Sequence, residues 1–415
     1  MNVSLVFLAI GLSIFIGFAA NYLFRKYGAP DVLVLILLGI LFGPGALGLI
    51  DESLTGAISG ITPYVAGIAL AIIMFEAGMD LNVVQVLRAS KVATLHTMLA
   101  FLLSMLVTAG VALSVMGWPL DVSLMLGAIL GGTSGAVVIP LVRKLRITEK
   151  TKIVLTIESA LTDVLVIVVA MSVLFFITEN SGDLWPAVRL LFSAFLVSAV
   201  IGVLAGLLWL RVLSRLSGQP FSYMITLATL LTIYALTEVV VGGGGGGAIA
   251  ALVFGLVLGN KDSVVRRFWR SGHKYSFDER IKDFNVEISF FVRTFFFVYL
   301  GIVASTIVFT PLHLILALLV FAGLVTARLV STVIERRGLR LDLYDEMAHL
   351  VMMPRGLSAA VLASIPLTTG AVTDEIGRTI LGTTVIVILL TTILASLGAY
   401  ILQHMTRWLA RSAEN

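Results

Sequence analysis

A short polar run, ESALTD at residues 158–163, stands inside the apolar stretch 153–177. In a helix, Ser159, Thr162 and Asp163 share one face because they stand at positions i, i+3 and i+4. That face offers two hydroxyls and one carboxylate. An all-oxygen cluster of this kind suits a hard monovalent cation or a proton better than a transition metal.

Asp163 is the residue that we expect to exchange a proton for a cation. It lies about ten residues into its apolar stretch, roughly 15 Å deep at 1.5 Å per residue. Burial disfavours the charged form of a carboxylate, so a proton and a cation compete for it. We expect Glu76 to be a second ligand. The other candidate ligand groups of this cation/proton site belong to Ser159, Ser134, Thr133 and Thr162.

Two further charges are expected to pair beside this site. Glu158 lies about five residues into its stretch, and Arg328 lies about five residues from the cytoplasmic end of the stretch 312–333, so both have similar depth along a helix. Because a buried charge is tolerated when it is paired, we predict a structural Glu158–Arg328 ion pair. Snorkelling of Arg328 to the interface, and cation binding by Glu158, are the alternatives.

The remaining intramembrane and metal-binding residue types give weaker signals. Arg355 lies in a predicted helix break, where it would neutralise helix-terminal dipoles or the carboxylates of the site. Arg293 has Glu287 as a loose candidate partner. The histidines show no metal-ligand spacing, and we expect them at the surface or the interface. They are His96, His273, His313, His349 and His404. No nucleophile, base and orienting residue form a set, so we expect neither an enzyme nor a cofactor.

Composition places these residues in a membrane protein. The chain has 415 residues, of which 59% are hydrophobic and 13% charged, with a mean hydropathy of +1.07. Soluble domains carry about 25% charged residues. The net charge of +4 reflects membrane orientation and predicts no nucleic-acid partner. The sequence has no cysteine, so disulfides and thiolate metal sites are excluded.

Hydropathy predicts an all-α polytopic protein with about thirteen transmembrane helices, because the apolar runs are too long and uniform for barrel strands. Most basic residues lie in one set of loops, including the largest loop at 260–283. The positive-inside rule then predicts a multi-pass protein of the cell membrane with its N-terminus outside and its C-terminus in the cytoplasm. The expected spans are 3–24, 30–50, 63–82, 92–116, 119–141, 153–177, 186–210, 220–241, 246–259, 284–308, 312–333, 346–367 and 379–403.

The spans divide into two inverted six-helix repeats. The fifth span is interrupted by Gly131–Gly135 and the twelfth by Pro354-Arg355-Gly356. Helix breakers at matching positions of two repeats are typical of a transporter binding site. The predicted organisation of the single unit 1–415 is a first repeat at 1–177, a linker helix at 178–215, a second repeat at 216–403 and a short cytoplasmic tail at 404–415.

The chain resembles the prokaryotic NhaP-type sodium/proton antiporters of the monovalent cation/proton antiporter superfamily over nearly its whole length. The motifs that carry this resemblance are Phe75-Glu76-Ala77-Gly78, the Gly-Thr break of the fifth span, Glu158-Ser159 with Asp163, Phe254-Gly255-Leu256, Phe296-Phe297 with Leu300-Gly301, Arg328 and Pro354-Arg355-Gly356.

The resemblance implies a dimerisation domain, a six-helix core with crossed broken helices at spans five and twelve, a homodimer and an elevator-like movement of the core. It implies ligand positions at Glu76, Ser134, Ser159 and Asp163, and pairing of Glu158 with Arg328.

Two positions depart from the family pattern. The family usually has Thr-Asp-Pro at the fifth-span break, where this chain has Thr133-Ser134-Gly135, and Asn before the essential Asp, where this chain has Thr162. Ser134 lowers the negative charge of the site. In having Ser and Thr at this break, the chain is similar to the glutathione-gated potassium efflux branch of the superfamily. We therefore expect electroneutral exchange of Na⁺ for protons, with K⁺/H⁺ exchange as the alternative. A passive cation channel and a sodium-coupled organic-anion symporter are the competing functions.

Overall fold

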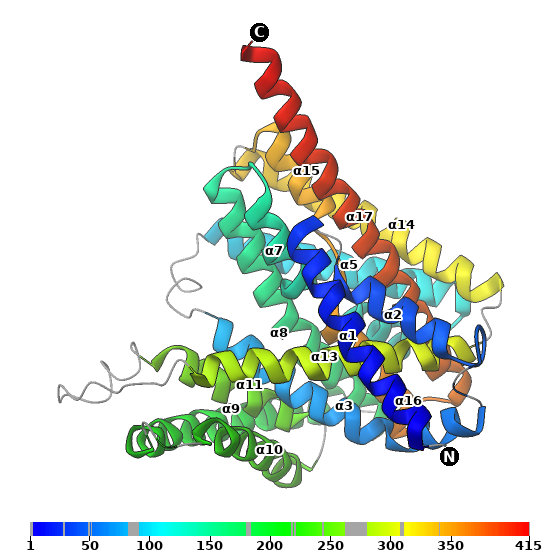
Figure 1. Ribbon diagram of the computed structural model, residues 1–415, viewed down its shortest axis with the longest axis vertical. Coiled ribbons are helices and arrows are strands. Elements are labelled where there is room, and N and C mark those ends of the chain that lie inside the picture. Colours follow the sequence, from blue (N-terminus) through cyan, green and yellow to red (C-terminus); the bar gives the residue numbers. More distant parts are fainter. Residues whose placement is uncertain are drawn as a thin grey trace. The chain divides into compact units, whose positions relative to one another are not determined.

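The computed structural model (Figure 1) describes residues 3–27, 30–48, 50, 52–81, 91–179, 184–216, 219, 221–242, 245–261, 280–307, 311–339 and 341–414. Over these residues the chain forms fifteen helices and no strand, which confirms the all-α fold class. The helices are α1 (Val3–Tyr27), α2 (Asp31–Phe42), α3 (Glu52–Asp80), α5 (Lys91–Met116), α6 (Leu120–Ile129), α7 (Gly135–Lys144), α8 (Glu149–Glu179), α9 (Leu184–Arg215), α10 (Ser222–Val241), α11 (Gly246–Gly259), α13 (Arg280–Thr306), α14 (Pro311–Leu339), α15 (Leu343–Val351), α16 (Leu357–Thr369) and α17 (Asp374–Glu414).

Every predicted span contains a helix, and the fifth and twelfth spans are each split into two short helices, α6 with α7 and α15 with α16. Seven described helices are long and apolar enough to cross a membrane. They are α5, α8, α9, α10, α13, α14 and α17. The count of thirteen spans, the inverted repeats and the orientation stay predictions.

Some boundaries differ from the expected ones. The second span was expected to reach residue 50, but α2 ends at Phe42, where Gly43 takes up an extended conformation. The tail predicted at 404–415 is helical as far as Glu414 and continues α17, the long red helix of Figure 1. Residues 262–279, which make up most of the expected basic loop, lie outside the described residues.

The chain divides into two compact units. The first comprises Met1–Pro63, Ala89–Val173 and Thr294–Asn415. In it, α5 packs against α6 and α14, and α17 packs against α14, α15 and α16. Their small and aliphatic side chains fill the interior. For example, Val138 and Leu141 of α7 form one buried cluster with Ala348 of α15 and Ala395 of α17.

The second unit comprises Tyr64–Arg88 and Leu174–Arg293. Here α9, α10 and α11 pack side by side (Figure 1), and α3 crosses α11 at close range. A Cβ atom at Gly255 would lie only 2.2 Å from the carbonyl oxygen of Phe75. Phe75 and Phe254 stack beside this crossing, with ring centroids 5.4 Å apart. Glycine therefore allows the backbone approach that fixes the helix segment carrying Glu76.

The two helix breaks of the first unit lie against each other. The backbone N–H of Ser134 donates to the carbonyl oxygen of Pro354 at 2.8 Å. Residues 352–356 are buried, so their backbone groups need partners inside the protein. Non-helical backbone at membrane depth is tolerated only where protein covers it, as it does here.

Candidate functional site

Asp163 lies on α8 at the point where the two breaks meet. Its Oδ1 accepts a hydrogen bond from Oγ of Ser358 at 2.6 Å. Its Oδ2 accepts one from the backbone N–H of Gly135 at 3.2 Å. Gly135 is the first residue of α7 and Ser358 the second residue of α16. The carboxylate is thus placed at the N-terminal ends of two short helices.

This placement has an electrostatic consequence. The first turn of a helix has unpaired N–H groups and carries a positive partial charge. Two such ends stabilise a carboxylate between them without contributing a formal charge. Asp163 as a whole residue is only partly buried.

Ser358 was missed by the sequence analysis. It stands two residues after the glycine that ends the twelfth-span break, where a hydroxyl on the first turn of α16 can reach a facing carboxylate. A hydroxyl just behind a Pro-Arg-Gly break was the available signal. Nothing in the sequence alone says which of the other spans faces that turn.

Thr162 ties α8 to the break in the fifth span. Its Oγ1 accepts from the backbone N–H of Thr133 at 3.0 Å and lies 3.2 Å from Oγ1 of Thr133. The same hydroxyl lies 3.3 Å from the carbonyl oxygen of Thr133 and 3.4 Å from that of Ser159, so its proton has two acceptors. Thr162 therefore fixes the backbone of the break, and the carbonyl of Thr133 points to α8.

Ser159 lies near the carboxylate, since a Cβ atom at Gly135 would lie 3.4 Å from Oδ2 of Asp163 and 3.7 Å from Oγ of Ser159. Ser134 is the residue before α7 and is buried. A Cβ atom at Gly356 would lie 2.1 Å from Oγ of Ser134, so only glycine lets the second break pack here. Ser159 is buried, and its Oγ donates to the carbonyl of Thr156 at 3.1 Å, which leaves its lone pairs available as acceptors.

Arg355 lies in the twelfth-span break and connects it to the fifth-span break. Its backbone N–H donates to Oγ1 of Thr391 at 3.0 Å. Its buried guanidinium donates through Nη1 to the carbonyl oxygen of Gly132, in the break that follows α6. The positive charge is therefore placed at the C-terminal side of α6, where a helix carries a negative partial charge.

Glu158 and Arg328 are paired in the structure. Nη1 of Arg328 contacts Oε1 of Glu158, and Nη2 donates to Oε2 at 3.0 Å. The guanidinium also donates to the carbonyl oxygens of His349 at 2.5 Å and Met352 at 3.3 Å. Both side chains are buried, so Arg328 does not snorkel to the surface. The pair connects α8, α14 and the end of α15.

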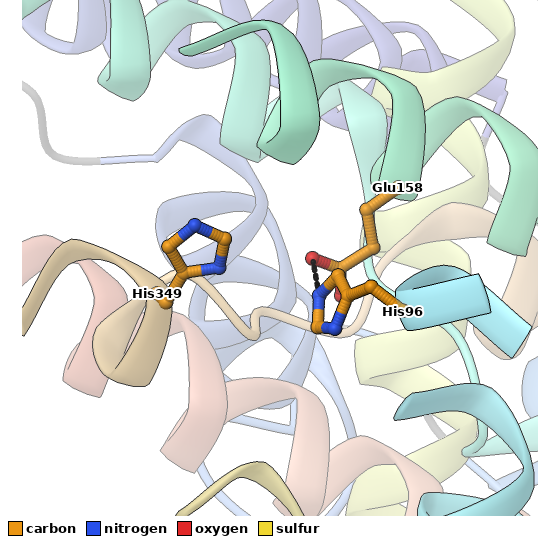
Figure 2. Close-up of side chains that lie close together, drawn as sticks. All are labelled: His96, Glu158 and His349. Carbon is orange, nitrogen blue, oxygen red and sulfur yellow. Dashed lines mark hydrogen bonds and ion pairs between the residues drawn. The ribbon is translucent and has the colours of Figure 1, made fainter. Parts of the chain in front are cut away.

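The expected surface placement of the histidines is wrong for His96 and His349. His96 is 2% exposed and His349 is 0% exposed. Nε2 of His96 lies 3.2 Å from Oε2 of Glu158, as Figure 2 shows. Glu335 lies beyond the predicted span 312–333, yet it is 4% exposed on α14, which continues to Leu339. Its carboxylate contacts His96 and lies 3.4 Å from Nδ1 of His349.

Glu76 belongs to the second unit. It lies on α3 and interacts electrostatically with Arg293 and Asp80. Arg293 thus has Glu76 as an acidic neighbour, and its pairing with Glu287, which is exposed, stays a prediction. The role of Glu76 as a second cation ligand stays a prediction.

The chain is similar to known proteins over most of its length. The family model described as "Sodium/hydrogen exchanger, transmembrane" matches residues 8–402. The K(+)/H(+) antiporter NhaP of Alkalimonas amylolytica is 25% identical over 264 residues, which are 62% of this chain and 44% of that protein. The Probable Na(+)/H(+) antiporter 2 of Methanocaldococcus jannaschii is 24% identical over 348 residues, 82% of this chain and 79% of that protein.

A solved structure has the same fold. The sodium proton antiporter MjNhaP1 from Methanocaldococcus jannaschii at pH 8 superposes with a TM-score of 0.76 at 24% identity, covering 96% of this chain and 98% of that one. The match to the Alkalimonas relative spans less than half of that relative's length. The family match covers nearly all of the present sequence. The chain therefore belongs to the sodium/hydrogen exchanger family.

Proposed function

We propose that this chain is a secondary active transporter that exchanges a monovalent cation for protons by alternating access. Na⁺ is the first candidate for that cation. The observation that carries the proposal is the position of Asp163, whose carboxylate accepts hydrogen bonds from Ser358 and from the first N–H of α7, where two broken helices meet. Relatives named as Na(+)/H(+) and K(+)/H(+) antiporters support it.

The exchange step needs only competition at one carboxylate. When Asp163 is ionised it attracts a cation, and when it is protonated the cation leaves. Ser159, Ser134 and the carbonyl of Thr133 supply neutral oxygens to the cation, and Glu76 supplies a second carboxylate. Thr162 holds the break in place. All of these donors are oxygens, which suit Na⁺ or K⁺.

K⁺/H⁺ exchange is the second candidate. Ser134 stands where the family usually has a carboxylate, and a less charged site binds a small, strongly hydrated cation such as Na⁺ less tightly than a second carboxylate would. Relatives named as K(+)/H(+) antiporters favour this alternative. With Asp163 alone exchanging, each turnover moves one proton against one cation, so exchange is electroneutral.

The cellular setting follows from the same proposal. The transporter lies in the cell membrane with its N-terminus outside and its C-terminus in the cytoplasm, works as a homodimer, and moves its core in an elevator-like manner. Its two repeats at 1–177 and 216–403 have inverted topology. No cofactor and no enzymatic step are part of the mechanism.

Reconstituted liposomes test this function. A pH gradient across the membrane should dissipate on adding Na⁺ or K⁺ to the wild type, and not in Asp163→Asn. Asp121→Asn is the matched control, because Asp121 lies at the start of α6 and accepts a hydrogen bond from the N–H of its own neighbour Val122. A current that flows without proton movement would identify a channel. Full activity of Asp163→Asn would refute the proposal.

A further inference from the structure

Three buried ionisable side chains lie on α5, α14 and α15, outside the Asp163 site. They belong to His96, Glu335 and His349 and are 0%, 3% and 0% exposed. Nδ1 of His96 is in direct contact with the carboxylate of Glu335. Nε2 of the same ring lies 3.2 Å from Oε2 of Glu158, the contact drawn as a dashed line in Figure 2. We propose that His96 and Glu335 share a bound proton that is not transported.

The hydrogen count at the His96 ring requires this proton. Both ring nitrogens face carboxylate oxygens. An ionised carboxylate only accepts hydrogen bonds, and a neutral imidazole has a single N–H. A neutral His96 between two ionised carboxylates would therefore place a nitrogen lone pair against an oxygen lone pair at one of its two contacts. One further proton, on Nδ1 of His96 or on the facing oxygen of Glu335, gives each contact a hydrogen.

The charges of the group require the same proton. Glu158 is neutralised by Arg328, whose Nη1 contacts Oε1 and whose Nη2 donates to Oε2 at 3.0 Å. Among the described residues, the ion pairs of Glu335 join it to His96 and, at 3.4 Å, to Nδ1 of His349, and neither ring carries a permanent charge. A buried charge without a counter-charge is costly. A proton shared between the carboxylate and the ring removes that cost, because the pair then carries no net charge.

His349 is the less suitable ring to hold the proton. It interacts electrostatically with Arg328, whose guanidinium also donates to its backbone carbonyl at 2.5 Å. A second positive charge beside that guanidinium would be repelled. Asp345, one turn earlier on α15, accepts hydrogen bonds from the backbone N–H and the hydroxyl of Thr148 at 3.0 and 2.8 Å. Its carboxylate is therefore bonded elsewhere and does not attract a proton to this ring.

The other charged groups on the neighbouring elements have partners of their own. Arg355, in the twelfth-span break, donates to the carbonyl oxygen of Gly132. Arg336 of α14 pairs with Glu346 of α15 at 2.6 Å. On its other side, α15 packs against α17 through uncharged side chains such as Ala395. These groups therefore do not supply the missing positive charge.

The proton gives the group a structural role. His349 lies two residues before the end of α15, the half-helix that leads into the twelfth-span break, while His96 and Glu335 lie on α5 and α14. While the proton is bound, Glu335 contacts both rings without an excess of charge. When the proton is lost at alkaline pH, the carboxylates of Glu158 and Glu335 face one neutral ring. The end of α15 should then open more readily.

Nuclear magnetic resonance of the full-length protein in lipid tests the proposal. Labelling histidine with ¹⁵N distinguishes an imidazolium from a neutral ring, and labelling glutamate with ¹³C distinguishes a protonated from an ionised carboxyl group. At mildly alkaline pH, where exposed histidines are neutral, the wild type should show one protonated signal that His96→Gln and Glu335→Gln each remove. His404→Gln, which alters an exposed histidine outside the group, should retain it.

The same signal separates this proton from the exchanged one. It should persist in Asp163→Asn and remain when NaCl or KCl is added to the wild type, whether or not Asp163 is the exchange site. Size-exclusion profiles check that each variant is folded. A neutral His96 together with an ionised Glu335 in the folded wild type would overturn the proposal. Loss of the signal on adding cation would show that the proton is transported and would overturn it as well.

Backbone amide exchange tests the structural role. Exchange at residues 343–353, corrected for the intrinsic effect of pH, should become at least about tenfold faster as the pH rises through the titration seen by magnetic resonance. This is the order expected for losing a hydrogen bond to a charged group. Glu335→Gln has no carboxylate to ionise and should show no such step. A wild type without the step would refute the structural role.

Discussion

The losses of stability from removing the two partners of the Glu158–Arg328 pair should not add, because each single substitution leaves a buried charge without its partner. Both groups are buried, and each oxygen of Glu158 faces one nitrogen of Arg328. Glu158→Gln leaves a buried guanidinium without its counter-charge. Arg328→Gln leaves a buried carboxylate with only His96 beside it.

The magnitudes follow from these contacts. Breaking a buried ion pair by deleting one partner costs about 3–5 kcal/mol. Arg328 also donates to the carbonyls of His349 and Met352, and each lost hydrogen bond costs about 1 kcal/mol. We therefore expect a loss of about 3 kcal/mol for Glu158→Gln and about 5 kcal/mol for Arg328→Gln. The double variant should lose about as much as Arg328→Gln alone, a coupling of about 3 kcal/mol.

Unfolding in detergent mixtures of rising SDS content, followed by tryptophan fluorescence, measures these free energies of unfolding. The matched control is the exposed Glu149–Lys152 pair on the same helix, at 2.7 Å. Its removal should cost at most about 1 kcal/mol, because exposed pairs contribute little. Losses that simply add in the Glu158/Arg328 double variant would show that the two charges do not depend on each other.

Three further substitutions test the helix breaks. Ser358→Ala removes a charge-assisted hydrogen bond worth about 1.5–3 kcal/mol to the exchanging carboxylate, so the cation concentration for half-maximal exchange should rise roughly ten- to hundredfold. Ser364→Ala, on the same helix, removes only a bond to the helix's own backbone and should change nothing. Gly356→Ala places a methyl group 2.1 Å from Oγ of Ser134 and should abolish exchange, whereas normal rates would show that the breaks separate easily. Thr162→Val removes the acceptor of the backbone N–H of Thr133 and should lower the free energy of unfolding by about 1–3 kcal/mol. The same unfolding in SDS measures this loss, and an unchanged midpoint would contradict it.

Much of the fold and part of the site could be predicted from local sequence. Hydropathy placed a helix in every expected span, and the glycines and proline at 131–135 and 354–356 placed the two breaks. Helical periodicity put Thr162 and Asp163 on one face of α8, and depth along the helices put Glu158 and Arg328 at one level. These features depend on residues a few positions apart, or on distance from a membrane surface, so a single sequence is enough to predict them.

The rest depends on which helices face each other. Ser358 reaches Asp163 only because α16 begins beside α8. His96 and His349 come from helices far apart in the chain, so their spacing in sequence gave no sign of a cluster. Glu335 lies two residues beyond the predicted span 312–333, yet α14 continues to Leu339 and Glu335 is buried. Tertiary packing overrides a hydropathy boundary at such places.

Proton release on cation binding is the measurement that tests the central claim most directly. The purified wild-type protein is kept in weakly buffered detergent solution near the pH at which it exchanges. It should release protons when NaCl or KCl is added, because the cation displaces the proton from Asp163. The release should saturate at about one proton per chain. Choline chloride should release none. Asp163→Asn should release no protons with any cation, while Asp121→Asn should behave like the wild type. Proton release of equal size from Asp163→Asn would contradict the assignment of Asp163 as the exchange site.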